Sequence, residues 1–161
     1  MSFKSLTIVT IAICLVLFVC LAGGLFETNS FGNYQIKQAA VTGNVTVRTA
    51  PGLYWQGFGQ ITTYPVSEDL DFEDSGMTVR FNDGSVASVK GTVKYKLPML
   101  EKLQMELHRD YGSFKNVEED LIRKNVAEAL SQAATLMVAE DSYSARRAEF
   151  SDAAKKQLEN G

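Results

Sequence analysis

The sequence contains few of the residues that build metal sites and catalytic sites. Cys14 and Cys20 are its two cysteines, and His108 is its one histidine. A metal site with two imidazole ligands is therefore excluded, and away from the cysteines only a carboxylate-rich oxygen site could remain. Both cysteines lie in one apolar run, on different faces of a helix, so they cannot cross-link the rest of the chain and the redox compartment stays undetermined.

The motifs of nucleotide binding and of nucleophilic catalysis are also missing. Gly57-Phe58-Gly59 lacks the third glycine of a dinucleotide loop, and no Lys-Ser or Lys-Thr pair follows a glycine-rich turn as a phosphate loop requires. No serine occupies a nucleophile elbow. We therefore predict no catalytic residue, no cofactor-binding residue and no metal ligand, and we interpret the protein as a non-enzyme that needs no cofactor.

Charges of both signs are present, but no basic block is. The chain has 16 basic and 19 acidic residues, and we expect no nucleic acid partner because no basic cluster could release phosphate counterions. The acidic run at residues 68–74 lacks the length and glycine placement of a calcium-binding loop. We interpret it as a solvated loop or strand edge, with an ion site or the carboxylates of a hydrolase as alternatives. His108 and Asp110 are interpreted as a solvated helix end.

The chain begins with a short tail, residues 1–5, and an uncharged apolar segment, residues 6–26. At 1.5 Å per residue this segment spans roughly the 30 Å hydrocarbon core, which predicts one transmembrane helix. Lys4 before it, against Glu27 and Lys37 after it, weakly leaves the tail in the cytoplasm and the domain on the opposite side. The alternatives are a cleaved signal peptide and a buried helix.

A run of strands is predicted after a polar linker at residues 27–33. Residues 34–42 and 45–48 are rich in β-branched side chains, and Gly43-Asn44 between them predicts a bent strand or a tight hairpin. An aromatic-rich stretch at residues 54–64 follows, with Gly57 and Gly59 as flexible points, and ends at Pro65. Asn82-Asp83-Gly84 predicts a central hairpin. The strand after it has a period of two: the side chains at 87, 89, 91, 93, 95 and 97 should face a core and those between them should face water.

Helical periodicity replaces this pattern after Pro98. Residues 99–110 place Leu100, Leu103 and Leu107 at helical spacing. A longer helix is predicted from Asn116, capped together with Glu119, and a last helix at residues 143–158 is predicted after a cap at Asp141-Ser142. Their apolar stripes comprise Ile122, Val126, Ala129, Leu130, Ala133 and Met137, then Phe150, Ala154 and Leu158. Strands followed by helices predict an α+β domain with an antiparallel sheet and helices packed on one face.

Trp55, flanked by Tyr54 and Phe58, allows two interpretations. It could lie at a membrane interface, because amphipathic rings favour the headgroup level, or it could belong to an ordinary core cluster.

The order of these features resembles the SPFH superfamily of stomatins, prohibitins, flotillins and bacterial relatives, also called Band 7 proteins. We describe the chain as prohibitin-like, although its residues do not separate that branch from the stomatin-like one. The similar features are the N-terminal membrane helix, a short extended segment, Pro51-Gly52-Leu53, Pro65, the Asp83-Gly84 turn with the alternating strand after it, Arg123, Ala127 and Glu128 in the long helix, and the run from Arg146 to Phe150.

The resemblance implies an SPFH-type domain over residues 34–161 and a scaffold function. Copies of such a scaffold pack side by side on a lipid bilayer as a homo- or hetero-oligomer, enclose a membrane patch and sometimes hold a membrane protease in check. Asn82 departs from the family, which often has threonine there. Similar proteins continue past the position of Gly161 into a strand and a long coiled coil, so we expect this chain to be truncated. An exported soluble binding protein with a cleaved signal peptide is the alternative function.

Overall fold

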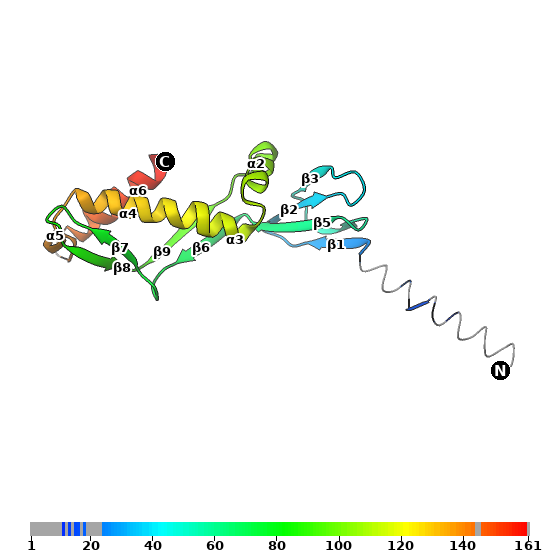
Figure 1. Ribbon diagram of the computed structural model, residues 1–161, viewed down its shortest axis with the longest axis horizontal. Coiled ribbons are helices and arrows are strands. Elements are labelled where there is room, and N and C mark those ends of the chain that lie inside the picture. The colour runs from blue at the N-terminus through cyan, green and yellow to red at the C-terminus, as the bar shows by residue number, and fades with distance from the viewer. Residues whose placement is uncertain are drawn as a thin grey trace. The chain divides into compact units, whose positions relative to one another are not determined.

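The computed structural model describes residues 11, 13, 15, 16, 18, 24–143 and 146–160 (Figure 1). The chain divides into two compact units. The first unit contains the residues up to Val66 together with Pro98–Asp110, and the second contains Ser67–Leu97 and the residues from Tyr111 onward.

Most of the predicted transmembrane segment, and the whole predicted tail at residues 1–5, lie outside the described residues. Searching the described part of the chain for a helix long and apolar enough to cross a membrane finds none. The end of the segment is not helical as predicted, because Gly24 and Leu25 form a turn and Phe26 opens the first strand.

Among the described residues, the first unit contains five strands and helix α2, besides the helical residues 11, 13, 15, 16 and 18. Strand β1 (Phe26–Asn29) pairs antiparallel with β4 (Gly52–Trp55). In a second antiparallel sheet β2 (Asn33–Gln38) lies between β3 (Val45–Arg48) and β5 (Gln60–Pro65). Helix α2 (Glu101–Tyr111) follows Pro98. Of the two alternatives at Gly43-Asn44, the hairpin is confirmed, because β2 and β3 pair antiparallel on either side of it.

The first unit corrects one prediction and adds detail to two others. The polar linker at residues 27–33 is largely strand, because β1 and the start of β2 fall within it. The aromatic-rich stretch contains the end of β4 and most of β5, and between them Gly57 and Phe58 turn the chain with positive φ. The helix predicted at residues 99–110 is confirmed as α2, although Leu100 precedes it and is 69 % exposed. The buried residue of α2 is Gln104, whose side-chain amide donates to the Pro98 carbonyl.

One long, bent hairpin forms the strands of the second unit. Strand β6 (Ser67–Asp71) pairs with β9 (Thr92–Lys96), and β7 (Met77–Arg80) pairs with β8 (Val86–Val89), both antiparallel. The predicted turn is confirmed, with Gly84 at φ +81° and the Asp83 carboxylate accepting from the Ser85 amide. The predicted period of two is also confirmed, since residues 88, 90, 92, 94 and 96 are exposed and those between them are not.

The helices of the second unit begin at other residues than predicted. Ser113, not Asn116, caps the long helix by accepting from the Asn116 amide, and the helix runs through α3 (Phe114–Asn116), the π-helical η1 (Val117–Ile122) and α4 (Arg123–Thr135). Asp141 and Ser142 lie inside α5 (Ala139–Tyr143), and the last helix, α6, is Arg147–Asn160.

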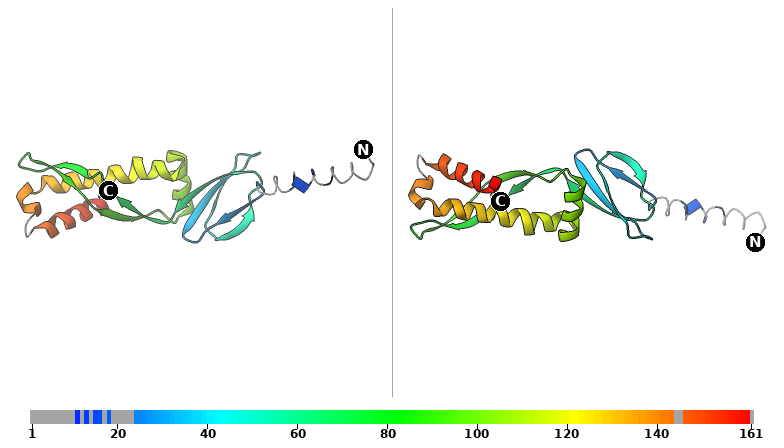
Figure 2. Two further views of the ribbon diagram at one scale, coloured as in Figure 1. Left: turned by 90° about the horizontal axis from the view of Figure 1, so that it is seen from below. Right: turned by 90° about the horizontal axis from the view of Figure 1, so that it is seen from above.

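Helices α4 and α6 run side by side in the second unit (Figure 2) and share an apolar core with the strands. Both predicted stripes contribute to it, as confirmed by the buried Val126, Ala129, Leu130, Ala133, Met137, Phe150 and Ala154. The strands supply Leu70, Phe72, Met77, Val79 and Phe81. The α+β class with antiparallel pairing is confirmed, although the pairing forms four small sheets instead of one.

Candidate functional site

Exposed apolar side chains gather at the end of the first unit where the chain leaves the apolar segment. Phe26 pairs with Trp55 across β1 and β4, and Phe58 lies in the loop that follows Trp55. Val41 lies in the loop beyond Gln38, whose β-sheet partner on β5 is Gln60. We call Phe26, Val41, Trp55 and Phe58 the aromatic end.

The four side chains of the aromatic end are exposed to an unusual degree for their type. Trp55 is 57 % exposed, Phe58 53 % and Val41 96 %. The Phe26 and Trp55 rings make an edge-to-face contact with their centroids 5.3 Å apart, so they support each other without being covered. Of the two interpretations of Trp55, the ordinary core cluster is wrong, and the membrane interface stays a prediction.

Backbone hydrogen bonds fix the aromatic end to the last residues of the apolar segment. The Leu25 carbonyl accepts from the Gln56 amide at 2.7 Å, and the Gly24 carbonyl accepts from the Phe58 amide at 2.8 Å. Phe58 holds a positive φ of 59°, which a non-glycine residue rarely adopts. A Cβ at Gly57 would lie 2.9 Å from the Trp55 indole nitrogen, so glycine there leaves room for the ring.

Few charges surround the aromatic end. Between Glu27 and Glu68 the sequence contains only Lys37 and Arg48 as charged residues. The Lys37 ammonium donates to the Trp55 carbonyl at 3.1 Å, and the Arg48 guanidinium lies over the Tyr54 ring, 4.4 Å from its centroid. This nearly uncharged stretch is the sequence signal that could have identified the surface. Aromatic rings with a lysine beside them match the composition of proteins at a membrane–water interface.

Buried amides hold the strands under the aromatic end together. The Asn29 side chain is 1 % exposed and donates to the carbonyls of Asn33 and Ala50, both at 3.2 Å. The Gln35 amide donates to the Thr63 hydroxyl at 3.1 Å and accepts from the Tyr54 hydroxyl at 2.8 Å. These hydrogen bonds connect β1 and β4 to the three-stranded sheet. They therefore fix the positions of the two strands that carry Phe26 and Trp55.

Two stacked tyrosines and His108 pack beside this network. The rings of Tyr34 and Tyr64 are stacked 5.2 Å apart, and the Tyr64 hydroxyl lies 2.8 Å from His108 Nδ1 in a hydrogen bond. Burial lowers the pKa of His108 and raises the pKa of Tyr64 to about 12, so both groups are neutral at pH 7. The predicted solvated pair with Asp110 is wrong, because Asp110 instead bonds Arg109 at 3.2 Å.

The acidic run at residues 68–74 is a solvated strand edge, as predicted. Glu68, Asp69 and Asp71 are exposed on β6, and Asp69 pairs with Lys94 at 3.7 Å. Across the described ranges, no three histidine, cysteine or carboxylate side chains come together as metal ligands would.

A family model described as "SPFH domain / Band 7 family" matches residues 26–160. The match begins with β1 and runs to the end of α6, so it includes strands and helices of both units. A comparison with curated proteins found no match.

Proposed function

Because the chain belongs to the SPFH domain / Band 7 family, we propose that it is a membrane-anchored, non-enzymatic scaffold that self-associates. Proteins of this family generally associate with membranes, commonly oligomerise and are generally not enzymes. In the finer form of the proposal, the apolar segment at residues 6–26 spans the bilayer once. The domain lies on the side opposite the short tail, and the assembled copies organise a membrane patch and restrain membrane proteins such as a protease.

The aromatic end is the observation that carries the proposal. Its loop is hydrogen-bonded to Gly24 and Leu25, so a segment that entered a bilayer before these residues would bring Trp55 and Phe58 to the headgroup level. Amphipathic aromatic rings favour that depth, and apolar area transferred out of water contributes about 25 cal/mol per Å². Exposed apolar side chains that would be a liability in water would thereby be covered.

The described residues of the apolar segment fit the same role. Residues 11, 13, 15, 16 and 18 are helical, and their large apolar side chains are more than half exposed. A lipid environment would cover them. Anchoring also confines the copies to two dimensions and raises their effective concentration, so modest lateral contacts can sum to a stable assembly.

Alkaline carbonate extraction of membranes that contain the full chain tests the anchor. We expect the chain to stay in the membrane pellet, because an apolar helix does not leave the bilayer when electrostatic contacts are removed. Release of the intact chain into the supernatant would refute anchoring. Intact mass separates this result from export with a cleaved signal peptide, since a mature protein that retains residues 1–26 has not been cleaved.

Particle size in mild detergent tests self-association. Light scattering coupled to size exclusion should give particles many times the 17.7 kDa of one chain. A monomeric particle at all protein concentrations would contradict the scaffold, and would favour a monomeric binding protein.

A further inference from the structure

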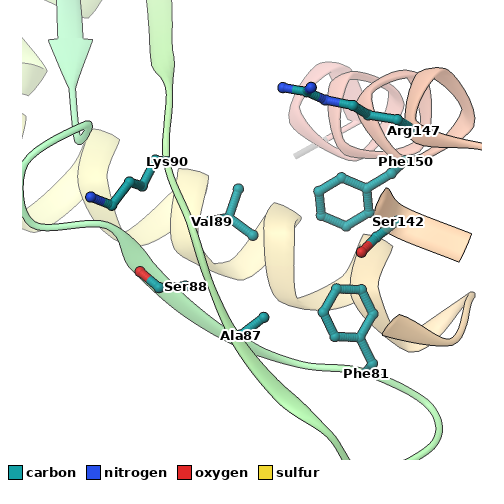
Figure 3. A pocket seen from close by; sticks show the side chains of 8 residues that line it. All are labelled: Phe81, Ala87, Ser88, Val89, Lys90, Ser142, Arg147 and Phe150. Atoms are coloured by element: carbon teal, nitrogen blue, oxygen red, sulfur yellow. The ribbon is translucent and has the colours of Figure 1, made fainter. Parts of the chain in front are cut away.

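A cavity of about 350 Å³ opens beside β8 in the second unit (Figure 3). Four consecutive residues, 87–90, line it, together with the aromatic rings of Phe81 and Phe150. Side chains of an extended strand alternate between two faces, and Figure 3 shows Ala87 and Val89 pointing toward Phe150 while Lys90 points the other way. A cavity that touches residues of both faces lies along the edge of the strand.

That edge of β8 is open to another strand. Within the described ranges β8 pairs only with β7, from Arg80 opposite Val86 to Met77 opposite Val89. Helix α6 forms the opposite wall, with Arg147 and Phe150 three residues apart on one helix face. Phe150 also contacts Phe81, with ring centroids 6.1 Å apart, so the groove has an aromatic floor. A strand edge facing a helix is an arrangement that accepts an extended segment by strand addition.

The groove is positively charged. Among the described residues that line it, the charged ones are Lys90 and Arg147, and they lie on opposite sides of it. Arg146 pairs with Asp141 at 2.6 Å and with Glu149 at 2.8 Å, so these two nearby carboxylates are already bound to another guanidinium. In the part of the chain that the structure describes, neither Lys90 nor Arg147 has an ion-pair partner. The groove therefore favours an acidic segment.

The acidic strand β6 has the matching properties. It pairs only with β9 among the described strands, which leaves its other edge open too. Glu68 and Asp71 are three residues apart on this strand, so their carboxylates project from opposite faces of it. The two cations lie on opposite sides of the groove, so each can meet one of these carboxylates. Both are exposed, and neither pairs with a cation in the described structure, whereas Asp69 pairs with Lys94.

The two open edges belong to opposite sides of one ribbon. Strands β6 and β7 follow each other along one side of the long hairpin, and β8 and β9 follow each other along the other side. A contact between the β6 edge of one copy and the β8 edge of the next is therefore head-to-tail. Such a contact repeats from copy to copy and closes into a ring when the rotation per copy allows it.

We propose that the groove between β8 and α6 receives the acidic β6 edge of a second copy of this chain, with Glu68 and Asp71 meeting Lys90 and Arg147. This inference rests on the proposed self-association and assigns the contact that produces it. The strand edges supply backbone hydrogen bonds, and the charges determine which edge is chosen.

Charge reversal on each side of the contact tests this inference in the full chain. The groove variant carries K90E and R147E, and the strand variant carries E68K and D71K. Each variant alone brings like charges together, so we expect its association to weaken about tenfold or more at low salt. An equimolar mixture of the two variants should recover large particles, because each mismatched surface then meets an oppositely charged one. A chain carrying all four reversals should recover them as well.

Matched controls separate this contact from a general effect of charge. K155E with K156E makes the same charge change on exposed positions of α6 outside the groove, and D152K with E159K matches the strand variant. We expect both controls to assemble like the unaltered chain. Circular dichroism melts of all variants exclude loss of fold as the cause of a smaller particle.

The outcomes distinguish this inference from the proposed function. If the unaltered chain is monomeric, self-association and this contact are both wrong. If the unaltered chain and both reversal variants form equally large particles, self-association stands and this contact is wrong. Failure of the mixture to recover large particles would also refute it. Weakening by the groove variant alone would show that the groove binds an acidic segment other than β6, which contradicts the assignment.

Discussion

The two units of this chain bury and expose opposite kinds of side chain. The first unit buries tyrosines and the amides of Asn29 and Gln35, and it exposes the aromatic end. The second unit buries an apolar cluster between its strands and helices and exposes carboxylates, lysines and arginines. Side-chain hydrogen bonds of Asn29, Gln35 and Tyr54 connect the strands of the first unit, whereas an apolar cluster connects the strands and helices of the second.

This contrast assigns the two proposed roles, contact with lipid and contact between copies, to different units. A nearly uncharged surface joined to an apolar segment suits contact with lipid, and a charged ribbon with two open edges suits contact between copies. Substitutions inside one unit should therefore change the stability of that unit and leave the other unit unchanged.

Phe81→Ala should cause the largest loss of stability, and only in the second unit. Phe81 is 4 % exposed and contacts Phe150, so its removal leaves a cavity that costs about 3–5 kcal/mol. Hydrogen exchange should quicken in α4 and α6 while the β2 amides keep their protection. Phe81→Leu, which preserves most of the volume, should cost less than about 1.5 kcal/mol. Equal loss of protection in both units would show that they do not open independently.

Asn29→Asp should destabilise the first unit by about 3 kcal/mol. The change keeps the shape but removes the amide donor and sets a carboxylate against the carbonyls of Asn33 and Ala50. Urea unfolding followed by the fluorescence of Trp55, which lies in the same unit, measures it. Ser30→Asp adds the same charge at the next, exposed position and should cost no more than about 0.5 kcal/mol. Similar costs for both variants would refute the role of the amide network.

Ser113→Ala should cost about 1 kcal/mol in the second unit, because the Ser113 hydroxyl caps the long helix at the Asn116 amide. Ser113→Asn keeps a capping oxygen and should recover most of that loss. Thermal melts of the unaltered chain and of both variants measure these differences in stability. If Ser113→Ala has no effect, a residue other than Ser113 caps the helix.

His108 should make the stability of the first unit depend weakly on pH. Burial lowers its folded pKa below the ordinary 6.5, so the unfolded chain binds the proton more readily. The contribution is therefore complete above pH 6.5 and is lost as the pH falls from 6.5 through the lowered folded pKa. The Tyr64 hydroxyl stays protonated throughout, because its pKa is about 12.

The matched variant for this effect is His108→Asn, which keeps an acceptor near the Nδ1 position and cannot titrate. Urea midpoints measured between pH 7.5 and pH 5.5 should fall further for the unaltered chain than for His108→Asn. Parallel profiles would mean that His108 has the same pKa in the folded and unfolded states.

Sequence patterns predicted the second unit better than the first. The period of two around Val89 and the period of helices from Val126 to Met137 report directly which side chains meet an apolar core. The order of the same features also led to the correct family. The start of the long helix was predicted at the wrong residue, because Ser113 and Asn116 both belong to the residue types that cap helices.

The first unit could not be predicted in the same way because its organisation depends on side-chain hydrogen bonds between distant residues. Strand β1 reads as a polar linker, since the burial of Asn29 follows from bonds to carbonyls that only the fold brings near. His108 likewise finds its partner Tyr64 across 44 positions of sequence. The exposure of Trp55 could not be predicted either. The alternation of side chains along β4 does not show which face of the strand is left uncovered by the rest of the fold.

The depth of Trp55 in a bilayer tests whether the aromatic end lies at a membrane interface, and Trp55 is the one tryptophan of the chain. The full chain is reconstituted into vesicles whose lipids carry a quencher either near the headgroup or near the end of the acyl chain. We predict blue-shifted emission, strong quenching by the headgroup-level probe and weak quenching by the deep one. If aqueous iodide quenches the emission fully and neither lipid probe affects it, the aromatic end lies in water. That result would contradict its proposed position at the membrane interface.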